Sequence, residues 1–172
     1  NKVRALLAYL AVEADRPQTR LRLAGLLWPD WPDASARTYL RQALLNLRRI
    51  LGNDDLDRPF LHTTRQSIQF NLDSDHVLDV HQLQWVMKDM ELGNDPALDR
   101  TALPRLQQIV SLYEGEFLEG FFLDGCTQYE EWQALTRENT RRQMVQVVKI
   151  LVQAFQREGD LAQSLRYAWR WV

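Results

Sequence analysis

The sequence predicts a mainly α-helical protein, in which a winged helix-turn-helix with a β-hairpin wing precedes an all-α, tetratricopeptide-like helical domain. Three observations favour this class. Apolar residues recur at helical spacing in three stretches of residues 2–51. The period then shortens to two over residues 60–71, and helical spacing returns from Val80 onward. Three helices followed by a hairpin is the order of a winged helix-turn-helix.

The first two predicted helices are short and amphipathic. Residues 2–14 form the first of them, on a face of four apolar side chains: Val3, Leu6, Leu7 and Leu10. Residues 20–28 form the second, because Thr19 is a suitable N-cap and Pro29 cannot continue a helix.

The third predicted helix covers residues 34–51. Asp33 is its expected N-cap, and Gly52 lies where a left-handed C-terminal cap is common. A helical wheel places its expected buried stripe on six residues: Ala36, Leu40, Ala43, Leu44, Leu47 and Leu51. The rest of this helix carries four arginines and no acid.

The hairpin and the linker complete the predicted first domain. Residues 60–64 and 68–71 are rich in β-branched and aromatic side chains, and residues 65–67 form a polar tip between them. The polar stretch that follows predicts a boundary between a winged-helix domain, residues 1–75, and a helical domain, residues 76–172.

Four helices are expected in the second domain: residues 80–91, 101–114, 129–157 and from 161 onward. Pro104 is tolerable because it falls in a first turn. A turn is expected at residues 93–96, and residues 114–125, with three glycines, are expected to be irregular. The last two helices form a hairpin of the kind that stacks in tetratricopeptide arrays. Six residues are expected in the core of the second domain: Trp132, Leu135, Met144, Val148, Leu151 and Phe155.

Composition excludes several classes of protein. The 172 residues have a net charge of −2 and a single cysteine, Cys126, so no intramolecular disulfide framework is possible. Charges interrupt every apolar run, so we expect no membrane span and a cytoplasmic protein. Residues 1–51 carry nine basic and four acidic side chains, a net of +5, whereas residues 79–172 carry ten and fourteen, a net of −4. This asymmetry suggests a front that faces a polyanion and a rear that faces protein.

The sequence favours no enzymatic function, cofactor or metal. It has no glycine-rich phosphate loop, and Cys126 has no evident base partner because no histidine follows it. His76, Asp79 and His81 are the one compact group that resembles metal ligands, but they lack the spacing of a known site.

A basic, acid-free helix face is what insertion into the major groove of double-stranded DNA requires, because the phosphates on both sides repel carboxylates. Arginine, glutamine and asparagine form paired hydrogen bonds with base edges, and an exposed leucine can contact a thymine methyl. The candidate DNA-binding residues of the third helix are Arg37, Thr38, Arg41, Gln42, Leu45, Asn46, Arg48 and Arg49. Arg65 at the hairpin tip is the candidate contact of the wing with the minor groove or a phosphate.

Four separate stretches resemble SARP-type bacterial transcriptional activators: residues 2–52, DVHQL (79–83), LYEGEFLEGFFL (112–123) and EEWQALTRENTRR (130–142). The motifs LLWP (26–29) and LRQALLNLRR (40–49) are the most specific part of the first stretch. In that family an OmpR/PhoB-type winged helix precedes a bacterial transcriptional activator domain with tetratricopeptide-like packing. The resemblance implies an N-terminal sheet, absent from this sequence, and often further helical repeats, so residues 76–172 are expected to be a truncated domain.

The resemblance also implies roles and partners. It assigns Arg41, Gln42, Leu45 and Asn46 to base edges, with Arg37 and Arg48 better placed for phosphates. It implies a sequence-specific transcriptional activator that binds direct repeats as side-by-side copies and recruits RNA polymerase, with homo-oligomer formation possible through the rear domain. Two alternatives stay open: the arginines form an ordinary solvated helix face, or the chain is a protein-interaction scaffold whose winged helix no longer binds DNA.

Overall fold

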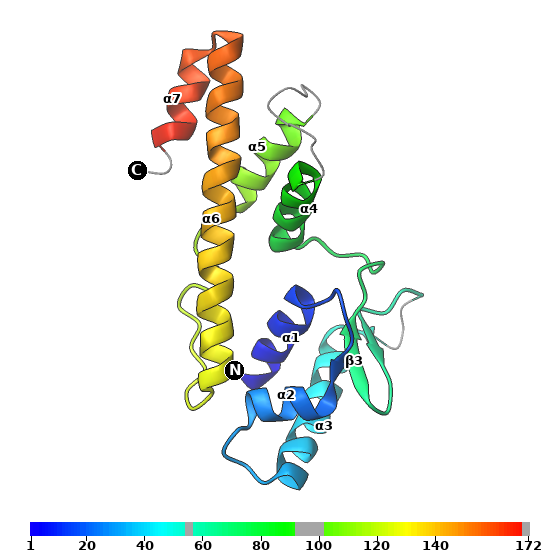
Figure 1. Cartoon of the computed structure of the whole chain (residues 1–172). Helices are drawn as coiled ribbons and strands as arrows, with labels where there is room; N and C mark the ends of the chain where they lie inside the picture. The colour runs from blue at the N-terminus through cyan, green and yellow to red at the C-terminus, as the bar shows by residue number, and fades with distance from the viewer. Residues whose placement is uncertain (54–56, 92–101, 170–172) are drawn as a thin grey trace. The chain divides into compact units, whose positions relative to one another are not determined.

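The computed structural model describes residues 1–53, 57–91 and 102–169. Within these ranges the protein is mainly helical, with seven helices and one three-stranded antiparallel sheet (Figure 1), which confirms the mainly α-helical class. Its contacts divide it into two compact units: Asn1–Val77 with Gly120–Trp132, and Leu78–Glu119 with Gln133–Val172. We describe each unit by itself.

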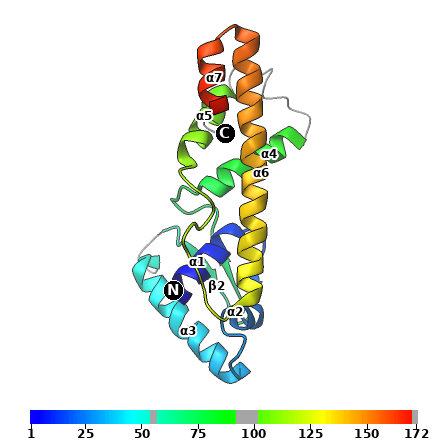
Figure 2. The ribbon, with the colours of Figure 1, turned by 90° about the vertical axis from the view of Figure 1, so that its left-hand side faces the viewer.

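The N-terminal unit contains three helices: α1 (Lys2–Val12), α2 (Arg20–Leu27) and α3 (Asp33–Ile50). Figure 2 shows α3 in cyan against α1 in dark blue. The predicted N-cap of α2 is confirmed, because Thr19 Oγ1 accepts a hydrogen bond of 3.2 Å from the Arg22 N–H.

The prediction for the C-terminal end of α3 is confirmed, whereas the prediction for its N-terminal end is not. The predicted N-cap Asp33 is wrong by one position, because Pro32 is the N-cap and Asp33 is the first helical residue, where its charge favours the helix dipole. At the other end Gly52 has φ +59°, the left-handed conformation expected just beyond a helix. The predicted buried stripe is confirmed for Ala36, Leu40, Ala43, Leu44 and Leu47, and Leu51 is partly buried.

The sheet has the strand order β1-β3-β2. Strands β2 (Leu61–Thr63) and β3 (Ser67–Phe70) form the predicted hairpin, with Leu61 opposite Phe70. Strand β1 (Gln18–Thr19) was not predicted, because two residues carry no periodic signal, and it pairs Thr19 with Ser67. The sheet therefore ties the start of α2 to the tip of the hairpin.

Residues Gly120–Trp132 return to pack in the N-terminal unit. Cys126 and Tyr129 are fully buried there, and burial raises the pKa of Tyr129. The ring centroids of Trp132 and Tyr9 lie 4.9 Å apart, and Trp132 Nε1 donates a hydrogen bond of 2.9 Å to Glu13 Oε1. The core of this unit thus includes residues from beyond the predicted boundary at residue 75.

The second unit is built from four helices: α4 (Asp79–Glu91), α5 (Leu103–Leu112), α6 (Thr127–Glu158, from Gln133 onward) and α7 (Leu161–Trp169). Pro104 lies in the first turn of α5, as predicted. The turn predicted at residues 93–96 lies outside the described residues. No helix in the described part of the chain is both long enough and apolar enough to cross a membrane.

The core of the second unit joins α4, α5 and α6 through residues such as Leu83, Leu106 and Leu151, none more than 1% exposed. The Phe155 and Tyr167 rings stack at 5.7 Å and attach α7 to α6. Leu135 was predicted in the core, but its side chain is 67% exposed, so that prediction is wrong. It follows the buried Gln133 by two positions, which places it on a different face of the helix.

Candidate nucleic-acid interface

The outward face of α3 carries its arginines together with three exposed apolar residues, Tyr39, Leu45 and Ile50, and the buried face is formed by five other apolar residues. The buried stripe of apolar residues packs α3 into the core of the N-terminal unit, and Leu40 in this stripe is only 1% exposed. Arg37, Arg41 and Arg49 are exposed on the other side, and Leu45 among them is 51% exposed. A large exposed leucine between arginines offers an apolar contact inside a charged surface.

The arginines of three elements meet around one surface concavity of about 770 Å³. Its lining residues come from the start of α2, from α3 and from the hairpin tip: Thr19, Arg20, Leu21, Arg37, Leu40, Arg41, Leu44, Leu45, Arg48, Arg65 and Gln66. Five of these eleven residues are arginines and none is acidic. Like charges gathered in a concavity focus a positive potential, which attracts polyanions.

The hairpin tip is ordered by its own hydrogen bonds. The Thr64 N–H donates to Ser67 O at 2.9 Å, and Thr64 Oγ1 accepts from the N–H groups of Gln66 and Ser67 at 3.1 and 2.9 Å. This side-chain turn places Arg65, which is exposed, at the outermost point of the hairpin.

The structure brings together five of the nine predicted DNA-binding residues. Those that line the concavity are Arg37, Arg41, Leu45, Arg48 and Arg65. Thr38, Gln42 and Arg49 are exposed on α3 beyond the lining. Asn46 is half-buried on the other flank of the helix, so less of its side chain is available to a ligand.

Arg20 and Gln66 line the concavity but were not among the predicted residues. Arg20 precedes Arg65 by 45 positions in the sequence, and strand β1 is what places it beside the hairpin. The available signal was the position of Arg20 directly after the N-cap Thr19, in the first turn of α2. That signal does not identify the hairpin tip as the neighbour.

Among the described residues, Asp33 lies close to an arginine of α3. Asp33 Oδ2 is 3.9 Å from Arg37 Nη2, and both side chains are more than half exposed, so the pair contributes little. Among the described residues, Arg41 and Arg65 form no ion pair with an acid. Their charge is therefore available to a bound anion.

Comparison with known proteins gives a partial match. Over 56 residues the chain is 38% identical to the transcriptional regulatory protein EmbR of Mycobacterium bovis and of Mycobacterium tuberculosis. This stretch is 33% of the chain and 14% of EmbR, so the match spans about one-seventh of that relative. No protein-family model matches the chain.

Proposed function

We propose that the N-terminal unit is the DNA-binding part of a transcription regulator. The observation that carries the proposal is the concavity, in which arginines from α2, α3 and the hairpin tip surround a surface without acids. The match to EmbR, whose name describes a transcriptional regulatory protein, supports the same function.

The order of the elements supports a winged helix-turn-helix. Two helices, α2 and α3, follow one another across a short connection, and a hairpin comes directly after them. In such a module the second helix enters the major groove, and the hairpin reaches the neighbouring backbone or minor groove. Helix α3 has 18 residues and is about 27 Å long, and a helix with its side chains is about 10–12 Å across, which fits a major groove about 12 Å wide.

The side chains divide into two groups by the atoms that they offer. Arg41 and Gln42 form paired hydrogen bonds with guanine and adenine edges, and Leu45 contacts a thymine methyl. Arg37, Arg48 and Arg65 hold phosphates, which positions the helix without reading sequence. Asn46 is the weakest base-reading candidate because it is half-buried.

The activity of the whole regulator is part of this proposal. It is that of a SARP-type activator that binds direct repeats, with the second unit as a tetratricopeptide-like activator domain that contacts RNA polymerase or another copy. The helix hairpin of α6 and α7 supports the tetratricopeptide likeness. Exposed apolar residues of α7 support protein contact: Leu161, Leu165 and Trp169 are 64%, 58% and 74% exposed.

The test is duplex binding by the whole chain at several salt concentrations, with targets selected from a random duplex pool. Three to five phosphate contacts predict that log affinity falls linearly with log salt at a slope of about −2.7 to −4.5. A repeated motif enriched in the pool would support sequence-specific binding to direct repeats. Absence of duplex binding at low salt would contradict the proposal and favour a protein-interaction scaffold built on the exposed residues of α7.

A further inference from the structure

We propose that Arg20 is a positioning residue that fixes the hairpin tip, so that Arg65 is held at the same concavity as the arginines of α3. The inference rests on the proposed function for its effect on DNA. Its structural part, the ordering of the tip by Arg20, stands on contacts within the N-terminal unit.

The turn at the tip leaves one carbonyl without its usual donor. In a common β-turn the carbonyl of the first residue accepts from the N–H of the fourth. Here the Ser67 N–H donates to the hydroxyl Oγ1 of Thr64 at 2.9 Å instead. The Thr64 carbonyl is therefore free to accept from outside the hairpin.

Arg20 supplies the missing donors. Its Nε and Nη2 donate to Thr64 O at 3.1 and 2.9 Å, and its backbone N–H donates to Gln66 O at 2.9 Å. Thr64 and Gln66 are the two neighbours of Arg65 in the sequence. One residue thus holds the chain on both sides of the arginine that the proposed function assigns to DNA.

Arg20 is itself firmly placed. It is the first residue of α2, directly after Thr19, which caps that helix and pairs with Ser67 across the sheet. Helix α2 packs on α3 in turn. Through Arg20 and α2, the position of the hairpin tip is therefore fixed relative to α3, the helix proposed to enter the major groove.

This placement matters because the hairpin is short. Strands β2 and β3 have three and four residues, and the tip beyond them is exposed. A mobile tip would lose conformational entropy each time it met DNA, which weakens binding. An arginine fork fixes a carbonyl at a defined angle, whereas a lysine offers one ammonium on a flexible stem.

The first experiment needs no DNA. Amide hydrogen exchange of residues 64–67 is compared between the wild-type chain, R20K and R20A, with R4A as the control, because Arg4 is exposed on α1 outside the concavity. We expect exchange at Ser67 to accelerate in R20A and R20K and to stay unchanged in R4A. Unchanged exchange in R20A would overturn the proposal while leaving the proposed DNA binding untouched.

The second experiment is a double-mutant cycle for duplex affinity. We expect R65A to weaken binding about fivefold, R20A and R20K to weaken it about threefold to fivefold, and R20A/R65A to be no weaker than about fivefold. A direct phosphate contact by Arg20 would instead multiply the two losses to about fifteenfold or more and would overturn the positioning role. Wild-type affinity in R20K would overturn it as well, because charge alone would then suffice.

Thermal unfolding of each variant distinguishes these effects from loss of the fold. Arg20 and Arg65 are not core residues, so we expect melting temperatures within a few degrees of the wild-type chain. Absence of duplex binding by the wild-type chain would overturn the proposed function together with the effect of Arg20 on binding. Hydrogen exchange at the tip would then still decide whether Arg20 orders it.

Discussion

Two helices of this protein are rich in arginine, but the surroundings of their arginines differ. Helix α3 presents Arg37, Arg41 and Arg49 outward, and the nearest described acid is Asp33, 3.9 Å from Arg37. In α6 of the second unit, Arg137, Arg141 and Arg142 each have a glutamate partner within 4 Å. The number of arginines is similar, but among the described residues these ion pairs of α6 outnumber that of α3.

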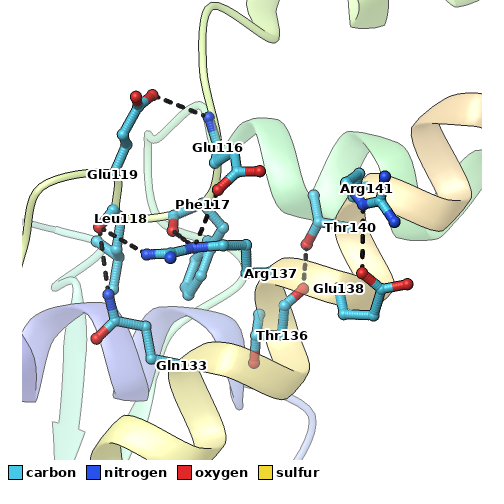
Figure 3. Close-up of polar contacts among 10 residues, drawn as sticks. All are labelled: Glu116, Phe117, Leu118, Glu119, Gln133, Thr136, Arg137, Glu138, Thr140 and Arg141. Atoms are coloured by element: carbon cyan, nitrogen blue, oxygen red, sulfur yellow. Dashed lines mark hydrogen bonds and ion pairs between the residues drawn. The ribbon is translucent and has the colours of Figure 1, made fainter.

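Arg137 is an arginine whose guanidinium is bound within its own unit (Figure 3). Its Nε and Nη2 donate to the carbonyls of Phe117 and Leu118 at 3.1 and 3.3 Å, and Gln133 Nε2 also donates to Leu118 O, at 3.2 Å. Leu118 has φ +49°, a conformation that costs a branched residue about 1–2 kcal/mol. The Arg137 guanidinium therefore holds an irregular loop, whereas Arg41 of α3 forms no ion pair with an acid among the described residues.

The largest expected effect comes from the buried side of α3. Replacing Leu40, 1% exposed, by Ala is expected to lower the free energy of unfolding of the N-terminal unit by about 2–5 kcal/mol through loss of apolar burial and the resulting cavity. Chemical denaturation followed by circular dichroism measures it. Leu45→Ala, at 51% exposure, is the matched control and should change stability by less than about 1 kcal/mol. Equal losses would mean that α3 does not have one buried and one available face.

The second effect separates base reading from phosphate contact on the available face. Arg41→Ala is expected to weaken binding to the selected duplex by about 1–3 kcal/mol and to relax sequence preference, whereas Arg37→Ala weakens all duplexes alike. Competition binding with selected and random duplexes measures both. If Arg41→Ala weakened the two duplexes equally, its assignment to a base edge would be wrong.

The elements of the N-terminal unit were largely predictable from local signals, because capping and periodicity act within a few residues. The N-cap Thr19, the buried stripe of α3 and the hairpin all follow from such signals. Strand β1 does not, because its two residues are strands only through pairing with β3. The role of Arg20 depends on that pairing, so it was missed for the same reason.

The second unit was less predictable in its details. The buried residues of α6 recur on one face, but polar Gln133 and Thr140 occupy that face while the apolar Leu135 lies off it, so apolar periodicity did not reveal that Leu135 is exposed. The positive φ of Leu118 has no sequence signal either, because glycine is the residue that normally marks it. Both are set by packing between residues distant in the sequence.

The third effect tests the role of Arg137 in holding residues 117 and 118. Arg137→Ala removes donors from the carbonyls of Phe117 and Leu118 and is expected to destabilise the second unit by about 1–3 kcal/mol. Hydrogen exchange of residues 114–119 should accelerate locally, and duplex affinity should remain at the wild-type value. A loss of duplex affinity without a loss of stability would show that arginines of α6 also bind DNA and would break the contrast with α3.

The smallest effect is expected at Arg141. Its Nε lies 3.2 Å from Glu138 Oε2 one turn earlier in α6, and both side chains are about half exposed. Solvent and salt screen such a pair, so Arg141→Ala should change the free energy of unfolding by less than about 0.5 kcal/mol, and less still at high salt. Denaturation at low and high salt measures the difference. Arg141 and Arg41 carry the same charge. An unchanged duplex affinity in Arg141→Ala would therefore show that binding depends on where the positive charges lie and not on their total number. A loss comparable to that of Arg41→Ala would instead mean that total positive charge governs binding, and the concavity at α3 would have no special role.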